Sequence, residues 1–179
     1  MRVIAGSLSG RIFESPKSLV THPMSERVRG GLFNTLGDIS GLTVFDPFSG
    51  SGALSFEAIS RGALRVVALD NDKQAYQTIR TNIDILQAAD KVEVFLKQAS
   101  SWMSGHQNAR FDVVIADPPY TDLRRDLLLR VAQMTTDRGI FVLSWPGTEK
   151  APPFIDFSII KQKSYGDAQL IFYRRTSKQ

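Results

Sequence analysis

From residue 43 onward, short apolar runs alternate with longer stretches of helical character, and this alternation constrains the fold more than any other feature. Runs of about five apolar residues bounded by turn residues are typical of strands buried on both faces, whereas longer amphipathic stretches are typical of helices. Repeated strand–helix units joined by right-handed crossovers form a doubly wound parallel sheet. The sequence therefore predicts an α/β fold with a mostly parallel sheet.

The pattern places the individual elements as follows. Predicted strands cover residues 43–48, 65–69, 92–96, 111–116 and 140–144, and a final antiparallel hairpin at the sheet edge covers 157–163 and 169–174. Predicted helices cover residues 26–36, 53–60, 73–86 and 123–134. The first helix has Ser25 as its expected N-cap and Gly37 as its expected stop. Gly30 and Gly31 lie inside it, and this pair either permits a close approach of another segment or is simply tolerated.

The first residues of the chain have a different pattern. Residues 2–14 contain short alternating segments broken by Gly6 and Gly10, which predicts a two-stranded β-hairpin. An isolated hairpin is barely stable in water, so we expect it to lean on the rest of the protein. The sequence thus predicts an N-terminal hairpin extension over residues 1–20 and a main domain over residues 21–179.

Composition narrows the class of protein. The 179 residues contain no cysteine, which excludes a disulfide framework and a thiolate metal site. The two histidines, His22 and His106, are isolated, so no metal site is predicted. No apolar stretch approaches the length of a membrane span or a signal peptide, which favours a soluble cytoplasmic protein. A net charge of +4 favours an anionic partner, with nucleic acid as the first choice and no membrane.

A glycine-containing turn follows the first predicted strand. It begins at Asp46 and includes Ser49, Gly50 and Gly52, directly before a predicted helix. Glycines let backbone amides approach a ligand closely, and a helix N-terminus favours negative groups. Asp70 ends the second strand about 20 residues later, where a carboxylate can bind ribose hydroxyls. These features predict a site for an adenosine-containing cofactor without choosing between a dinucleotide and S-adenosylmethionine.

A second loop, Asp117-Pro118-Pro119-Tyr120, follows the fourth predicted strand and makes that choice. An exocyclic base amino group is a poor nucleophile because its lone pair is delocalised into the ring. The Asp117 carboxylate and the Pro118 carbonyl can accept its two protons and direct the lone pair toward a methyl donor, while Tyr120 stacks on the base. The loop therefore predicts methyl transfer to a base. The plainer alternative is a stiff turn with Tyr120 packed against the core.

These motifs resemble one family, the bacterial 16S ribosomal RNA guanine-N2 methyltransferases, which belong to a larger N6-adenine-methylase-like group. The resemblance covers nearly the full length of the chain. It is carried by residues 2–6 with Gly10-Arg11, by 25–34, by 49–63 and by 117–120. The chain departs from the family pattern at Gly30, where an acidic residue is usual, and at Gln98, where aspartate is usual.

The resemblance implies a class I S-adenosylmethionine-dependent methyltransferase with a Rossmann-like sheet. Its implied acceptor is a guanine in small-subunit ribosomal RNA, within the 30S subunit or an assembly intermediate, and its implied state is a monomer. Gln98 and Ala99 are then expected to contact the adenine of the cofactor, with Asp117 at the same site. The residues expected to face RNA are Arg2, Arg11, Arg27 and Arg29. Of the last two, which do not share a helix face, one is expected to contact phosphate and the other to pair internally.

Three alternatives remain open at the level of sequence. The same loop chemistry serves N6-adenine methylation of DNA or RNA, although 179 residues leave no separate target-recognition domain. A non-catalytic RNA-binding factor of ribosome assembly would keep the fold but has no use for an intact Asp117 loop. A nicotinamide-dependent dehydrogenase is disfavoured because Ser55 occupies the position of the third glycine of its fingerprint.

Overall fold

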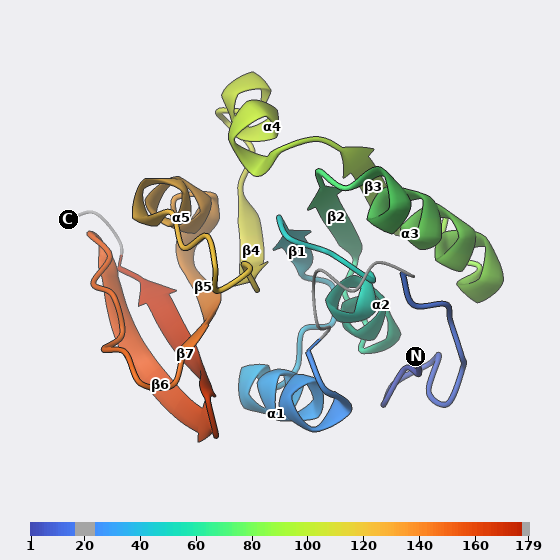
Figure 1. Cartoon of the computed structure of the whole chain (residues 1–179), viewed down its shortest axis with the longest axis horizontal. Helices are drawn as coiled ribbons and strands as arrows, with labels where there is room; N and C mark the ends of the chain where they lie inside the picture. Colours follow the sequence, from blue (N-terminus) through green and yellow to red (C-terminus); the bar gives the residue numbers. More distant parts are fainter. Residues whose placement is uncertain (17–23, 177–179) are drawn as a thin grey trace.

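The computed structural model describes residues 1–16 and 24–176 of the chain. Within these residues, one seven-stranded sheet has the order β3-β2-β1-β4-β5-β7-β6 (Figure 1). Strands β1 to β5 pair in parallel, whereas β7 runs antiparallel to both of its neighbours, as predicted for a mostly parallel sheet with an edge hairpin. The strands are β1 (Thr43–Asp46), β2 (Arg65–Asp70), β3 (Val92–Leu96), β4 (Phe111–Ala116), β5 (Thr135–Pro146), β6 (Phe157–Tyr165) and β7 (Ala168–Arg175).

Helices cover both faces of the sheet, so the protein has three layers. One face carries α1, α2, α3 and the N-terminal segment, and the other carries α4 and α5 (Figure 1). The helices of the described chain are α1 (Glu26–Leu36), α2 (Ala53–Ser60), α3 (Lys73–Leu86), α4 (Ala99–Gly105) and α5 (Arg125–Ala132).

Successive residues of the central strands are buried in opposite layers. In β4, Val113 and Ile115 belong to the core on the side of α1 to α3, whereas Val114 and Ala116 belong to the core beneath α4 and α5. Because side chains alternate across a strand, a strand that is covered on both faces needs apolar residues at consecutive positions. This is why the sequence shows an unbroken apolar run here.

The predicted boundaries of α1, α2, α3, β3 and β4 are confirmed, and the other boundaries differ. Strand β1 ends at Asp46 and not at residue 48, because Pro47 has no N–H for the ladder. Strand β5 begins at Thr135, five residues before the predicted start at Ile140. Its pairing with β4 contains a register shift, and Arg138 has a φ of 63°, so no regular apolar pattern marks its first half. Helix α4 is also absent from the predicted elements, because its short sequence ASSWMSG is too brief for a periodic signal.

Both predicted caps of α1 are confirmed. The Ser25 side chain accepts a hydrogen bond from the Val28 amide at 3.3 Å, which satisfies one of the unpaired N–H groups of the first turn. Gly37 follows the helix with a φ of 78°, and its N–H donates to the Phe33 carbonyl. A residue with a side chain would be strained in that conformation.

The N-terminal segment is less regular than predicted. Within residues 1–16, the expected hairpin is reduced to an isolated antiparallel bridge between Arg2 and Ile12. Helix α2 holds the tip of the segment, since the Ser60 carbonyl accepts from the Ser7 amide at 2.7 Å. Val3 and Phe13 are buried in the same core as α1 to α3. The segment is therefore integrated into the core on that face, and the predicted domain boundary between residues 20 and 21 lies outside the described residues.

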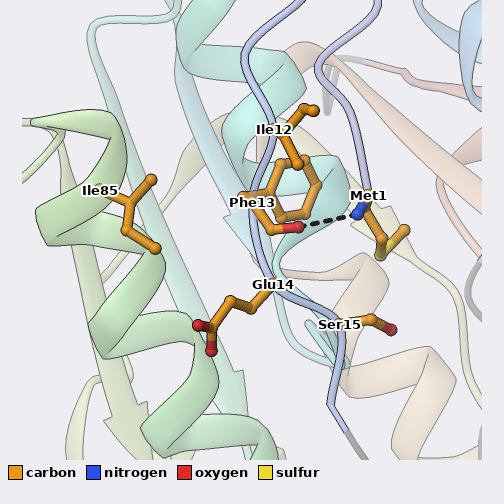
Figure 2. A pocket seen from close by; sticks show the side chains of 6 residues that line it. All are labelled: Met1, Ile12, Phe13, Glu14, Ser15 and Ile85. Atoms are coloured by element: carbon orange, nitrogen blue, oxygen red, sulfur yellow. Dashed lines mark hydrogen bonds between the residues drawn. The ribbon is translucent and has the colours of Figure 1, made fainter.

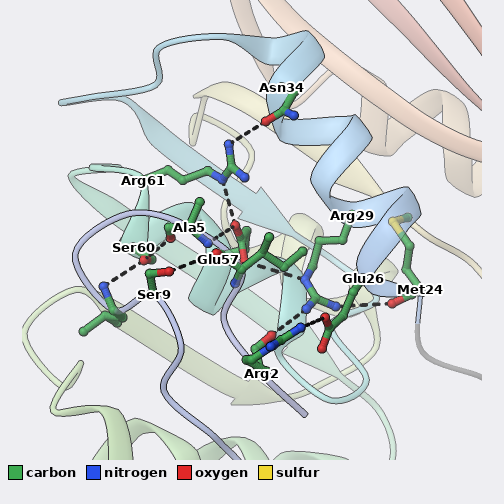
Figure 3. Close-up of polar contacts among 12 residues, drawn as sticks. Arg2, Ala5, Ser9, Met24, Glu26, Arg29, Asn34, Glu57, Ser60 and Arg61 are labelled. Atoms are coloured by element: carbon green, nitrogen blue, oxygen red, sulfur yellow. Dashed lines mark hydrogen bonds and ion pairs between the residues drawn. The ribbon is translucent and has the colours of Figure 1, made fainter.

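A buried carboxylate, Glu57 of α2, joins this segment to α1 (Figure 3). Its oxygens accept hydrogen bonds from the amides of Ile4 at 2.8 Å and Ala5 at 3.2 Å, and from Arg61 Nε at 2.8 Å. Arg29 Nε of α1 lies 3.8 Å away. A fully buried charge is stable only with such partners, so Glu57 depends on three separate segments of the chain.

The two glycines of α1 provide a matched pair of substitutions. A Cβ at Gly31 would lie 2.0 Å from the Tyr165 hydroxyl oxygen, whereas a Cβ at Gly30 would lie 3.8 Å from its nearest neighbour, in Ile4. We expect Gly30→Ala to stabilise the protein by about 0.5–1 kcal/mol through helix propensity, and Gly31→Ala to destabilise it because Tyr165 must move. Urea denaturation of both variants checks this expectation. Adding Tyr165→Phe to Gly31→Ala should restore part of the loss, and equal stabilisation by both alanines would contradict the proposed contact.

Candidate active site

Three carboxylates meet where adjacent parallel strands end. Asp46 is the last residue of β1, Asp70 is the last residue of β2, and Asp117 directly follows β4. The sheet order β2-β1-β4 places these strand ends side by side. This edge of an open α/β sheet is where ligands bind. Asp70 and Asp117 both raise the pKa of Asp46 through charge repulsion, a smaller effect than burial, which confirms that the three side chains lie near one another.

The glycine turn after β1 is tied to β2 by hydrogen bonds. The Gly50 amide donates to Asp70 Oδ2 at 2.7 Å, and the Ser49 hydroxyl donates to the Leu69 carbonyl at 2.8 Å. Gly52 has a φ of 78°, and a Cβ there would lie 2.6 Å from the Phe56 ring. A Cβ at Gly50 would meet nothing within 4 Å. Gly52 is therefore required by the backbone conformation of the turn and by its packing against Phe56. Gly50, in contrast, borders open space at the strand ends.

Asp46 is fully buried and only half satisfied. Its Oδ2 accepts a hydrogen bond from the Ser55 hydroxyl at 2.7 Å, but its Oδ1 has no hydrogen-bond partner within the described residues. Burial raises the pKa of Asp46 to about 7, although the Ser55 hydrogen bond opposes the rise. A buried acceptor without a partner costs free energy, so this oxygen suits a cationic or hydrogen-bond-donating ligand.

The Asp117 loop carries the acceptor groups. Asp117 is half-buried, Pro118 is buried, and Tyr120 is 40% exposed. Burial raises the pKa of Asp117, and a hydrogen bond with the Ser144 hydroxyl opposes the rise. The Tyr120 hydroxyl lies 2.7 Å from Ser144 Oγ. Ser144, near the end of β5, is not among the predicted site residues, although it follows an apolar run just as Asp117 does.

Two further predicted residues follow β3, at the outer end of the sheet. Gln98 precedes α4 as its N-cap residue, is exposed and makes no capping hydrogen bond with its side chain. Ala99 is buried as the first residue of α4. Asp70 lies between this position and Asp46 along the sheet, so the strand order arranges Gln98, Asp70, Asp46 and Asp117 in a row.

Arg29 does not lie on the surface. Its side chain is fully buried and donates to the carbonyls of Arg2 at 2.7 Å and Met24 at 3.3 Å (Figure 3). Burial lowers the pKa of Arg29, and the nearby Glu57 carboxylate opposes this effect. The expectation that Arg29 contacts RNA therefore does not hold in this structure. Of Arg27 and Arg29, Arg29 is the one that pairs internally.

The other three predicted RNA-facing arginines are exposed. Arg27 projects from the first turn of α1. Arg2 forms an exposed ion pair of 2.7 Å with Glu26, a contact of small energetic value. Arg11 donates to the last carbonyls of α3, at 2.9 Å to Ile85 and 3.2 Å to Leu86. Such contacts stabilise a helix C-terminus, so Arg11 has a structural role at the end of α3 in addition to its predicted role in RNA binding.

Two cavities of the described structure lie away from the carboxylate row. One of about 660 Å³ lies between the N-terminal segment and α3 (Figure 2), and is lined by Met1, Ile12, Phe13, Glu14, Ser15 and Ile85. Another of about 500 Å³ lies between α4 and α5 and includes Met103, Arg110, Leu129 and Arg130. Neither contains a predicted site residue. The candidate site is therefore defined by the strand ends that carry the three carboxylates.

Residues 1–16 and 24–176 contain no group of three or more histidine, cysteine or acidic side chains suited to a metal ion. His106 stacks on Trp102 with ring centroids 4.0 Å apart, and His22 lies outside the described residues. Over the same described ranges, no helix combines the length and apolar character needed to cross a membrane.

Solved structures define the class of protein. The structure of "Putative methyltransferase yhhF" from Escherichia coli aligns with a TM-score of 0.88 and 26% sequence identity, over 99% of each chain. This likeness of fold agrees with the sequence-based prediction of an α/β fold with a mostly parallel sheet. The protein therefore has the Rossmann-like fold of the class I S-adenosylmethionine-dependent methyltransferases.

Sequence comparison identifies the family. The chain belongs to the family described as "Conserved hypothetical protein 95", whose model matches residues 1–174. Ribosomal RNA small subunit methyltransferase D of Haemophilus influenzae is 32% identical, over 97% of this chain and 92% of that protein. The Escherichia coli protein of the same name is 33% identical over 78% and 68% of the two chains. The resemblance found in the motifs is thus confirmed at the level of the family.

The raised pKa of Asp46 predicts a pH-dependent stability. The folded protein retains a proton on Asp46 that the unfolded chain releases near pH 4, so the free energy of unfolding should fall between about pH 4 and pH 7. The slope from this group is at most about 1.4 kcal/mol per pH unit. Asp46→Asn should flatten it, whereas Asp90→Asn, at an exposed position, should leave it unchanged. Urea denaturation of ligand-free protein across this range measures the slope, and identical slopes in all three proteins would refute the assignment.

Proposed function

We propose that the protein transfers a methyl group from S-adenosylmethionine to the exocyclic N2 amino group of a guanine in small-subunit (16S) ribosomal RNA. The observation that carries the proposal is the Asp117 loop at the end of β4, next to Asp46 at the end of β1 and in one row with Asp70 at the end of β2. Relatives named Ribosomal RNA small subunit methyltransferase D support ribosomal RNA as the acceptor. The choice of guanine N2 rests on the resemblance in the motifs.

The row of strand ends suits the length of the donor. Adjacent strands are about 4.8 Å apart, so positions from β3 to β4 span roughly 14 Å along the sheet edge. In this arrangement, Gln98 and Ala99 contact the adenine of the donor, and Asp70 binds its ribose hydroxyls. Gly50 has no side chain, so the donor can approach the backbone of the glycine turn closely. The unpartnered Oδ1 of Asp46 accepts a hydrogen bond from the ammonium group. S-adenosylmethionine supplies an electrophilic methyl group carried on a positively charged sulfur.

The Asp117 loop then prepares the acceptor. The Asp117 carboxylate and the Pro118 carbonyl accept hydrogen bonds from the two N–H groups of the amino nitrogen, which directs its lone pair out of the plane of the base. The exposed face of Tyr120 provides a surface on which the extruded base stacks. Positioning the lone pair in line with the methyl group and placing a fixed negative charge nearby supply most of the rate enhancement.

The acceptor RNA is proposed to lie within the 30S subunit or an assembly intermediate. The small net charge of +4 supports this, because a weakly basic enzyme gains affinity when folded RNA presents the target. Arg27, with the exposed parts of Arg2 and Arg11, forms the proposed RNA-facing surface of the N-terminal region. A monomer is favoured because the edge strand β6 carries exposed Lys161 and a register shift, both of which discourage edge-to-edge pairing.

The acceptor is tested directly with radiolabelled S-adenosylmethionine. The protein is incubated with 30S subunits, free ribosomal RNA or DNA, and the products are digested to nucleosides. We expect label in N2-methylguanosine from small-subunit RNA. Label in N6-methyladenine would move the reaction to the adenine branch, and donor binding without transfer to any acceptor would refute the proposed substrate. Absence of donor binding would favour a non-catalytic assembly factor.

The role of Asp117 is tested by two substitutions in one loop. Asp117→Ala removes the acceptor for one amino proton, so methyl transfer should fall at least about 1000-fold while donor binding, measured by calorimetry, survives. Asp122→Ala is the matched control, since this carboxylate pairs only with the exposed Arg124 among the described ion pairs. It should retain nearly full activity. Full activity of Asp117→Ala would eliminate the mechanism.

A further inference from the structure

Ser144 stands at the site without an assigned role. Its side chain lies beside Asp117 because β4 and β5 pair in parallel, with Ala116 opposite Leu143 one residue earlier in each strand. Only 4% of Ser144 is exposed. The Tyr120 hydroxyl lies 2.7 Å from the Ser144 oxygen. On the side of β4, an interaction with the Ser144 hydroxyl lowers the pKa of Asp117. A buried hydroxyl needs such polar partners.

The chemistry of these groups fixes the direction of the hydrogen bonds. An ionised carboxylate can only accept, so Ser144 must donate its single proton to Asp117. The Ser144 oxygen then acts as the acceptor at its 2.7 Å contact with Tyr120, and the phenol donates. The result is a chain of two hydrogen bonds that runs from the Tyr120 hydroxyl through Ser144 to the Asp117 carboxylate.

The contact with Tyr120 joins the Asp117 loop to strand β5. Tyr120 is 40% exposed, and it lies 24 residues before Ser144 in the sequence. An exposed aromatic ring on a loop has rotational freedom unless a polar contact holds it. Ser144 belongs to a central strand of the sheet and is therefore a rigid anchor for the hydroxyl end of the ring.

We propose that Ser144 is a positioning residue of methyl transfer, whose hydroxyl fixes the orientation of the Asp117 carboxylate and the pose of the Tyr120 ring together. The inference rests on the proposed function, in which Asp117 holds the amino group and Tyr120 stacks on the base. One Asp117 oxygen is oriented by Ser144, so the carboxylate presents its other oxygen to the base. The same hydroxyl fixes the plane of the Tyr120 ring, and the base must lie parallel to that plane in order to stack on it.

The hydrogen bond also favours the charged form of Asp117, which is the form that accepts an amino proton. The other charged groups around it act in the opposite direction. Asp46 approaches from β1, and its charge and that of Asp117 repel each other. Asp167, in the turn between β6 and β7, and Asp117 itself both raise the pKa of Tyr120 after the larger effect of burial. Burial raises the pKa of Asp117, and the interaction with Ser144 offsets part of this rise at the residue that must stay ionised.

The hydrogen-bond chain can be measured without any activity assay. The carboxyl signal of Asp117 is titrated by NMR in the wild-type protein and in Ser144→Ala, Ser144→Thr and Tyr120→Phe. We expect the midpoint to rise in Ser144→Ala, to return toward the wild-type value in Ser144→Thr, and to change little in an exposed control, Ser158→Ala. An unchanged Asp117 midpoint in Ser144→Ala would overturn the proposal.

Kinetics test the positioning role. With the acceptor established for the wild type, kcat of Ser144→Ala should fall roughly 10-fold while KM for S-adenosylmethionine stays constant, because a hydrogen bond to a charged group is lost. The acid limb of the pH–rate profile should move to higher pH. Since Ser144 and Tyr120 act through one chain, Ser144→Ala combined with Tyr120→Phe should lose no more than the worse single variant. Losses that multiply would overturn the shared chain.

The two proposals fail in different ways. If the wild type transfers no methyl group but the Asp117 midpoint still rises in Ser144→Ala, the proposed function fails and the hydrogen-bond chain stands. If the wild type methylates RNA while Ser144→Ala matches it in kcat, pH profile and Asp117 midpoint, the positioning role fails and the proposed function stands. Thermal unfolding of each variant verifies that it is folded.

Discussion

The parallel pairing of β2, β1, β4 and β5 is the constraint on which the rest of the structure depends. It ends four strands at one edge and thereby collects Asp46, Asp70, Asp117 and Ser144 from positions spread over 99 residues of sequence. The helices bury the strands on both faces, and the apolar alternation of β4 between two cores fixes its register. A slip of one residue would remove the acids from this edge.

Collecting carboxylates at a buried edge has an energetic cost, visible in the raised pKa values of Asp46, Asp70 and Asp117. Burial is the first cause in each case, and the hydrogen bonds from Ser55, from the Gly50 amide and from Ser144 offset only part of it. In the proposed reaction, the donor carries positive charge to this edge. The same groups that strain the ligand-free protein therefore favour the bound state.

A second buried network stabilises the face of the sheet that carries α1, α2 and the N-terminal segment. Glu57 and Arg29 are fully buried and connect α2 and α1 to the N-terminal segment, which contributes Val3 and Phe13 to the core. The network explains why an irregular segment with an isolated bridge is nevertheless ordered. It also places Arg27 on the outer side of the same short helix whose Arg29 faces inward, so packing divides the basic residues of α1 between structural and surface roles.

The sequence by itself determined the α/β class, most strand and helix positions, the glycine turn and the acidic residues of the site. These features are local, because periodicity and turn residues act within a few positions of one another. Tertiary structure alone decided that Ser144 meets Tyr120, that Arg29 is buried beside Glu57, and that the expected hairpin shrinks to one bridge in residues 1–16. The physical reason is that each of these outcomes depends on which distant residues the sheet order brings into contact. No local pattern encodes that order.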